Sequence, residues 1–268
     1  MLHRKNYSLH SQFSAEQGVR QINIGNRKHM KNAAEFVSEK DDVFGRIASR
    51  YDLLCDLFSF GIHRLWKNRV ATSIASEPWN SLLDVASGTG DIVLRILDKK
   101  ELLPNQKIIA SDISPKMLSI AKARLEHHKN AVELQQLDAH AIPSIGNASI
   151  DVYSMSLGLK IVDREKAISE ALRVLKPGGR LITLEASNIP VNWIHKLYLS
   201  YMSLCMPLIG WIATKGDPSA YKYLLHGVKD FPKAEELQSE LYSSGFEKVS
   251  FKRLTFGIVA IHIARKPN

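Results

Sequence analysis

Three apolar runs of this chain each end in an aspartate, and the first of them leads into a glycine-rich loop. The aspartates are Asp84, Asp112 and Asp138, and the loop SGTGD places Gly88 and Gly90 directly after the first run. Glycines at such a point permit a tight turn and let a ligand approach the backbone. Because open α/β sheets bind ligands at the carboxyl ends of their strands, a nucleotide-like ligand is expected beside these residues.

The residue types distinguish among nucleotide-like ligands. No Gly-Lys-Ser/Thr follows the loop, which excludes a phosphate-binding P-loop, and SGTGD lacks the third glycine of a dinucleotide site. Asp84 suits a cationic amine, Asp112 can accept hydrogen bonds from both hydroxyls of a ribose, and Asp138 can accept from the adenine amine. Adenine, ribose and an amino-acid head without phosphate describe S-adenosylmethionine. The sequence therefore predicts a class I S-adenosylmethionine-dependent methyltransferase.

Alternating strand and helix patterns position these residues. Strands are predicted at 81–87, 107–112, 132–138, 150–156, 248–254 and 257–266, with a Pro-Gly-Gly turn leading into a further strand within 177–187. Helices are predicted at 91–100, 114–128, 163–176 and 236–246. Ser114 is expected to cap the second of these helices, with Pro115 in its first turn. Alternation at this spacing indicates an α/β, doubly wound, Rossmann-like fold whose sheet is mostly parallel with an antiparallel last strand.

The composition indicates one large domain with a basic extension. The chain has 268 residues, 45% of them apolar and 24% charged, with a net charge of +9. Residues 1–29 carry five lysines or arginines against one glutamate, a net charge of +4. We interpret 1–40 as disordered or as an upstream extension, with a mitochondrial transit peptide or a start at Met30 as alternatives, and 41–268 as the folded domain. Cys55 and Cys205 lack metal-ligand spacing, so free thiols and no metal site are expected.

Three segments carry a closer resemblance to a known family. YDLLCDLFSFGIHRLWKNRV (51–70), LRVLKPGGRLITLEAS (172–187) and GDPSAYKYLLHGVKDFP (216–232) resemble signatures of the ubiquinone/menaquinone biosynthesis C-methyltransferase family, and the likeness runs from about Val43 to His262. The resemblance implies S-adenosylmethionine-dependent methylation of a carbon on a prenylated quinol ring. By position it implies cofactor contacts at Thr89, Asp112, Asp138, Ala139 and Ser156, to which Asp84, Gly88, Gly90 and Met117 are added.

Two positions depart from the family pattern. Leu54-Cys55 stands where the family has Met-Asn, and Lys160-Ile161 stands where it has Arg-Asn. A cation beside the acceptor would offset the cost of ionising a phenol, so Lys160 is expected to keep the electrostatic role of the arginine, although it lacks the planar fork. Ile161 cannot replace the hydrogen bonds of an amide. The alternative interpretation of Lys160 is a solvated residue at a helix start.

Further residues are candidates for the acceptor side of the site. His63 is a candidate general base near pH 7, with helix packing as the alternative. Tyr51 and Asp52 are expected to close over the methionine end of the cofactor or over the acceptor, with a plain surface pair as the alternative. One of Tyr221 and Tyr223 is expected to line the acceptor pocket.

The apolar insertion at about 188–232 is expected to form a helical lid. Its segment 192–213 suits a lid or an interface, plain core is a second alternative, and a membrane span is a third, interrupted by Pro207 and Gly210. An oily lid beside a basic surface leaves peripheral membrane contact open, and a homodimer as well. The expected location is the cytoplasm, at the inner membrane or not, with the mitochondrial matrix as an alternative.

Three other functions compete with quinol methylation. They are methylation of another small apolar or phenolic acceptor, a non-catalytic role in a quinone-biosynthetic complex, and methylation of nucleic acid. The last is disfavoured because no base-flipping Asn-Pro-Pro-Tyr segment and no catalytic Pro-Cys are present.

Overall fold

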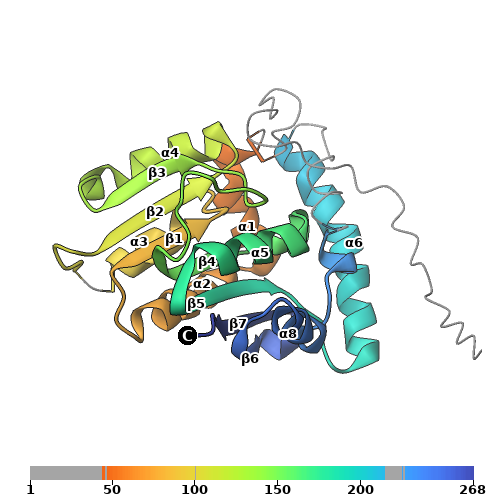
Figure 1. Cartoon of the computed structure of the whole chain (residues 1–268). Helices are drawn as coiled ribbons and strands as arrows, with labels where there is room; N and C mark the ends of the chain where they lie inside the picture. The colour runs from red at the N-terminus through yellow and green to blue at the C-terminus, as the bar shows by residue number, and fades with distance from the viewer. Residues whose placement is uncertain (1–43, 46, 100, 215–224, 226) are drawn as a thin grey trace, which may run out of the picture.

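The computed structural model describes residues 44, 45, 47–99, 101–214, 225 and 227–268, and these form a seven-stranded sheet covered by helices on both faces (Figure 1). The strands are β1 (Ser81–Val85), β2 (Lys107–Asp112), β3 (Val132–Gln136), β4 (Ile150–Ser156), β5 (Leu175–Ala186), β6 (Glu247–Leu254) and β7 (Val259–Arg265). Their order in the sheet is β3-β2-β1-β4-β5-β7-β6. The first five pair in parallel, whereas β7 pairs antiparallel with both β5 and β6, which confirms the predicted fold class.

The helices connect the strands and form two layers. They are α1 (Tyr51–Ser59), α2 (His63–Ala75), α3 (Asp91–Leu97), α4 (Pro115–Leu125), α5 (Arg164–Val174), α6 (Asn192–Thr214) and α8 (Ala234–Ser243). The oxygen of Ser114 accepts from the backbone N–H of Met117 at 3.3 Å, so the predicted cap of α4 is confirmed.

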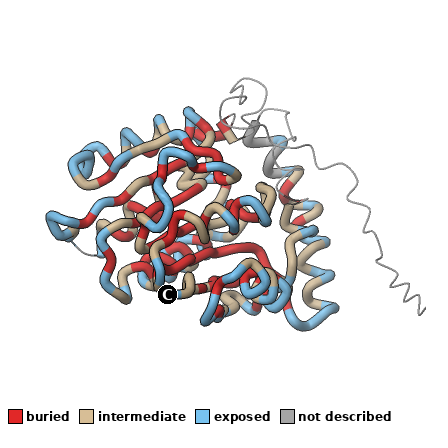
Figure 2. Tube along the Cα trace, in the orientation of Figure 1, coloured by how far each residue is buried: buried red, intermediate tan, exposed pale blue. Residues whose placement is uncertain are grey.

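Two apolar clusters fill the spaces between the sheet and these layers. Leu82 and Val152 belong to a cluster with α2, α3 and α4, whereas Leu83 and Tyr153 belong to one with α5 and α8. Neighbouring residues of a strand point to opposite faces of a sheet, so both faces of β1 and β4 are buried. Figure 2 shows the central strands of the sheet as buried along most of their length. Such burial holds the strand ends, and the residues that follow them, in fixed positions.

The helix predicted at 163–176 is too long at its C-terminal end. α5 ends at Val174, and β5 begins at Leu175 rather than after the Pro-Gly-Gly sequence. The pairing of β5 with β4 shifts register between Ile150 and Val152, which pair with Leu175 and Arg180. The segment KPGG is accommodated as an irregularity of a strand, which helical spacing in the sequence does not indicate.

The predicted insertion contains one long helix, α6, of 23 residues with Pro207 inside it. Figure 1 shows α6 running along one side of the domain, and it contacts α1. No helix in the described part of the chain has the length and apolar content needed to cross a lipid bilayer. Tyr221 and Tyr223 lie outside the described residues, as does the whole predicted extension at 1–40.

Candidate functional site

The loop after β1 has the open turn that its glycines predict. Gly88 and Gly90 both adopt left-handed backbone conformations, with φ of 58° and 78°. A Cβ on Gly88 would meet no atom within 4 Å, whereas one on Gly90 would lie 3.0 Å from Leu125 of α4. Gly88 therefore leaves open space where a ligand can approach, and Gly90 lets α3 and α4 pack closely.

Asp112 ties this loop to the end of β2. One of its oxygens accepts from the backbone N–H of Gly88 and the other from that of Ser114, both at 2.9 Å. The arrangement fits the predicted contact with two ribose hydroxyls, which stays a prediction.

Two buried atoms at the carboxyl ends of β3 and β4 lack hydrogen-bond partners among the described residues. They are Oδ2 of Asp138, after β3, and Oγ of Ser156, the last residue of β4. The other oxygen of Asp138, Oδ1, accepts from the backbone N–H of His140 at 2.9 Å. The ring Nδ1 of His140 lies 2.8 Å from the same oxygen. Buried polar groups are rarely left unsatisfied, so both atoms are suited to a bound ligand. These residues fit the adenosine of S-adenosylmethionine, and the buried side chains of Ala139 and Met117 offer apolar contacts.

Asp84 lies deeper than the predicted contact with a cationic amine requires. Its side chain is buried, with hydroxyl donors from Ser154 at 2.5 Å and from Ser87. Burial raises the pKa of Asp84 to about 6, against the effect of these two hydrogen bonds. The carboxylate therefore lies behind the loop, where its charge would act on a nearby cation, and direct contact stays a prediction.

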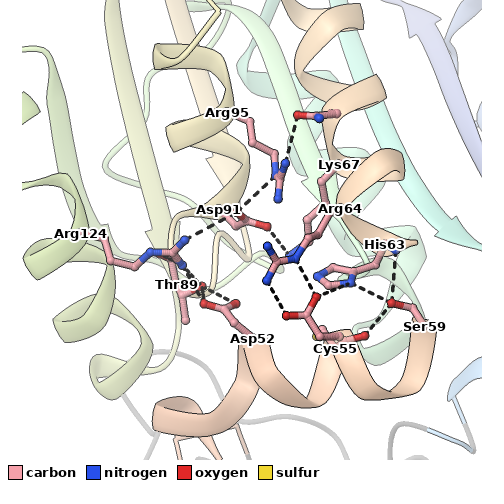
Figure 3. A network of polar contacts seen from close by, with 12 residues as sticks. Asp52, Cys55, Ser59, His63, Arg64, Lys67, Thr89, Asp91, Arg95 and Arg124 are labelled. Atoms are coloured by element: carbon pink, nitrogen blue, oxygen red, sulfur yellow. Dashed lines mark hydrogen bonds and ion pairs between the residues drawn. The ribbon is translucent and has the colours of Figure 1, made fainter. Parts of the chain in front are cut away.

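Thr89 and Asp52 belong to a polar network that joins α1 to the glycine loop and to α4 (Figure 3). The hydroxyl of Thr89 lies 3.1 Å from Oδ1 of Asp52. The guanidinium of Arg124 contacts both residues, at 2.7 Å from the Thr89 hydroxyl and 2.9 Å from Asp52. Sequence reasoning missed Arg124, because one arginine in a surface helix carries no signal of its own. The network holds α1 against the cofactor loop.

A second set of ion pairs extends this network toward α2. Asp91, at the start of α3, lies 2.9 Å from the buried amine of Lys67 and 3.3 Å from Arg95. Lys67 and the charge of Arg124 help to lower the pKa of Asp91, although burial acts in the opposite direction. In Figure 3 these side chains point toward one another from α2, α3 and α4. The helices around the loop are therefore fixed by charge pairs as well as by apolar packing.

An apolar cavity of about 290 Å³ lies between α1, α2, α6 and the ends of β4 and β5. Tyr51, His63 and Lys160, which the sequence places far apart, are all in its wall. The remaining lining is mainly apolar and aromatic, as binding pockets for oily ligands usually are; α6 contributes Tyr198, Tyr201, Met202 and Met206. Asp52 does not line the cavity, because its side chain is directed toward Thr89.

Lys160 is the cation of this cavity. It lies in the short 3-10 turn Leu159–Ile161, and only 7% of its side chain is exposed, so the interpretation as a solvated residue is wrong. Its amine donates to the carbonyl of Leu157 and lies 3.8 Å from Oε2 of Glu185. Burial lowers the pKa of Lys160, and the charge of Glu185 opposes that shift.

Glu185 and Gly227 support the turn that carries Lys160. Glu185 is fully buried in β5, and its Oε1 accepts from the backbone N–H of Leu159 at 2.6 Å. Burial raises the pKa of Glu185, and Lys160 counters this effect. Gly227 approaches from the other side, where a Cβ would lie only 2.8 Å from the carbonyl oxygen of Lys160. The turn is therefore held between a carboxylate and a backbone with no side chain.

The other candidates in the cavity wall are neutral at pH 7. Burial, together with the charge of Lys67, lowers the pKa of His63 to about 4, and its Nδ1 lies 2.8 Å from the hydroxyl of Ser59. Repulsion by Cys55 and burial raise the pKa of Tyr51 well above its usual value. Burial also raises the pKa of Cys55. A neutral imidazole can accept a proton, so the role of His63 as a base stays a prediction.

Solved structures share the fold. The chain superposes on an S-adenosylmethionine-dependent methyltransferase from Thermotoga maritima with a TM-score of 0.60 and 19% identity, covering 84% of this chain and 98% of that one. It superposes on the CurJ carbon methyltransferase with a TM-score of 0.57 and 20% identity, over 75% of this chain and 54% of that one. The chain thus has the fold of class I S-adenosylmethionine-dependent methyltransferases.

Sequence comparison places the chain within that class. The profile of the ubiE/COQ5 methyltransferase family matches residues 30–266. Ubiquinone/menaquinone biosynthesis C-methyltransferases of Paracoccus denitrificans and Francisella tularensis subsp. novicida are 39% and 37% identical to this chain. Each alignment covers 84% of this chain, with 92% and 89% of those proteins. The chain belongs to the ubiE/COQ5 methyltransferase family.

Proposed function

We propose that this enzyme methylates a ring carbon of a prenylated quinol in ubiquinone or menaquinone biosynthesis. The observation that carries the proposal is one buried lysine, Lys160, in the wall of a mainly apolar cavity. The names of the relatives from Paracoccus and Francisella support the same acceptor. A quinol matches such a cavity, because its ring and isoprenoid chain are apolar and its phenolic oxygen can become an anion.

The cavity adjoins the cofactor cradle through neighbouring residues of the chain. Ser156 has a buried hydroxyl in the cradle, and Leu157 is in the cavity wall. Tyr51 lines the cavity, while the adjacent Asp52 contacts Thr89 of the cofactor loop. When bound, S-adenosylmethionine supplies an electrophilic methyl group. Holding an acceptor carbon in line with such a group can contribute about 7–11 kcal/mol to catalysis.

The task of the chain's own residues is to make the ring carbon nucleophilic. Ionising a phenol of pKa about 10 at pH 7 costs roughly 4 kcal/mol. The amine of Lys160 can offset that cost beside the phenolate, and the apolar walls strengthen the interaction by excluding water. The imidazole of His63 lies in the same wall, but a pKa of about 4 makes it a weak base toward a phenol, so we assign it the role of a neutral hydrogen-bonding partner of the acceptor. Tyr51 and Cys55 stay protonated and can donate hydrogen bonds.

The substitution of Lys160-Ile161 for the family's Arg-Asn leaves this electrostatic role in place. An ammonium supplies the same charge as a guanidinium but a single point of contact, so the acceptor is positioned less strictly. We infer slower turnover or a looser choice of ring substituents than in relatives that carry the arginine.

Complementation tests the proposal. The chain and its Lys160→Arg/Ile161→Asn double variant are expressed in a bacterium that lacks its quinone C-methyltransferase, and quinones are measured by mass spectrometry. Restored methylated quinone from the unmodified chain is expected. Recovery in the double variant alone would favour another phenolic acceptor. Failure of both, with folded protein that binds S-adenosylmethionine, would refute the quinol and favour a non-catalytic role.

The proposed place of action follows from the acceptor. We propose that the enzyme works in the cytoplasm at the inner membrane, or at the corresponding matrix surface in a mitochondrion, because prenylated quinols dissolve in lipid. We also propose that the enzyme is a homodimer and that it does not act on nucleic acid. Fractionation of cells that express the protein tests the location. Light scattering of the purified protein tests the oligomeric state.

A further inference from the structure

Helix α6 carries a row of exposed apolar side chains, and Figure 2 shows the helix as a mixture of exposed and partly buried segments. We call it the α6 stripe; its residues are Trp193, Leu197, Tyr201, Leu204, Leu208 and Trp211. They recur at spacings of three and four, so they lie on one side of the helix. Exposed fractions run from 38% for Tyr201 to 71% for Leu204, and no described segment covers them. An apolar patch of this extent marks an interaction site.

We propose that the α6 stripe docks on an anionic lipid bilayer, with the helix lying in the plane of the interface. The order of residue types supports this partner. Tryptophans stand at both ends of the stripe and leucines between them. Indole rings prefer the boundary between lipid and water, whereas leucines enter the apolar region. At a rise of about 1.5 Å per residue, the stripe is roughly 27 Å long.

The charges around the stripe favour an anionic lipid over a second copy of the chain. Residues 192–214 include no aspartate or glutamate and one lysine, the exposed Lys196. A second exposed lysine, Lys229, lies beside Leu204 in a surface groove. The same helix of a second copy would offer these lysines no carboxylate, because 192–214 contains none, whereas anionic headgroups would neutralise them. The exposed Asp230 is the acid that follows Lys229.

The position of the cavity gives this surface a role in catalysis. Tyr201 belongs both to the α6 stripe and to the cavity wall, so the two meet at the same side chain. The cavity, at about 290 Å³, is at the small end of the range for ligand pockets, and a long isoprenoid chain must extend beyond it. Docking through α6 would let the chain remain in the bilayer while the ring enters the cavity. This step rests on the proposed quinol acceptor.

The test compares Leu204→Glu with Leu103→Glu, a matched control on an exposed leucine before β2. Sedimentation with vesicles of phosphatidylcholine and phosphatidylglycerol is expected to recover the unmodified chain and the control. The affinity of Leu204→Glu for the vesicles should fall at least about tenfold, because the variant loses buried apolar surface and adds a negative charge. Raising the salt concentration should weaken binding of the unmodified chain, since screening shortens the reach of the lysines.

Activity separates this inference from the proposed function. On a short-chain, water-soluble quinol, Leu204→Glu should match the unmodified chain, and it should lose activity only on a long-chain quinol presented in vesicles. Vesicle binding without activity on either quinol would refute the acceptor and leave the docking surface standing. Equal vesicle binding by Leu204→Glu and Leu103→Glu would overturn the docking surface. A second result would also overturn it: the unmodified chain does not bind vesicles and is a dimer in light scattering, and Leu204→Glu is a monomer.

Discussion

The buried pair of Lys160 and Glu185 should contribute to folding and to catalysis in ways that can be separated. The two charged groups lie 3.8 Å apart, with 7% and 0% of their side chains exposed. At an effective dielectric constant of about 20, unit charges at that distance attract by about 4 kcal/mol. Burial opposes this attraction, since it lowers the pKa of Lys160 and raises that of Glu185. The pair is therefore tolerated because each charge compensates the other.

Removing one partner should cost more than removing both. Lys160→Met leaves a buried carboxylate without its cation and is expected to lower the free energy of unfolding by about 3 kcal/mol. Glu185→Gln should cost a similar amount, because it leaves a buried ammonium. The double variant Lys160→Met/Glu185→Gln contains neither charge, so its loss should fall short of the sum by about 2 kcal/mol or more.

Activity should not recover with stability. If Lys160 offsets the roughly 4 kcal/mol needed to ionise the acceptor at pH 7, the folded double variant should lose kcat by a factor of up to about 1,000. Urea unfolding followed by fluorescence gives the stabilities, and turnover of quinol at saturating S-adenosylmethionine gives kcat. Lys166→Met, on an exposed lysine of α5, is the matched control and should change neither. Additive losses of stability, or a double variant with normal kcat, would refute the reasoning.

Three further predictions concern the buried polar groups. Asp84→Asn should stabilise the ligand-free protein by about 2 kcal/mol at pH 7, because the raised pKa of this carboxyl marks its charged form as unfavourable there, while weakening S-adenosylmethionine binding at least about tenfold. Thermal unfolding and calorimetry measure both, and a fall in Tm would contradict the first. Lowering the pH from about 6.5 to about 4 should reduce the free energy of unfolding of the unmodified chain by up to about 3 kcal/mol more than that of His63→Gln, because only the unfolded chain protonates this imidazole in that range. Equal dependence on pH for the two proteins in urea unfolding would count against this prediction. Asp138→Ala should raise the Kd for S-adenosylmethionine about tenfold and Asp138→Asn far less, since an amide still accepts from adenine; an equal loss in both variants, measured by calorimetry, would exclude that contact.

The sequence predicted the ends of β2 and β4 correctly, because there the signal is local, whereas β1 and β3 each end two residues before the predicted position. Asp112 and Ser156 each close a strand at the predicted residue, and the glycine loop follows from residue types that few other turns use. The end of α5 was wrong for the opposite reason. Helical spacing continues through Leu175, and the pairing with β4 that claims this residue as strand is a long-range interaction that local spacing does not encode.

Electrostatic partners were the part of the site that sequence could not supply. Lys160 was singled out from its position after β4, but its burial depends on Glu185 from the next strand and on Gly227 from a distant segment. Arg124 has no local feature that distinguishes it from the other basic residues of α4, although it joins Asp52 to Thr89. Such roles arise only when the fold brings separate elements together.

The close approach of Gly227 to Lys160 limits how this chain can evolve. With 2.8 Å between a Cβ at position 227 and the carbonyl oxygen of Lys160, even alanine must displace the turn that carries the amine. In a genetic selection for respiratory growth, lesions at this glycine would therefore be recovered alongside lesions at the lysine, although no side chain at 227 faces the acceptor. A lineage that acquires a new acceptor can vary the cavity wall freely, but it inherits this glycine for as long as it keeps the turn.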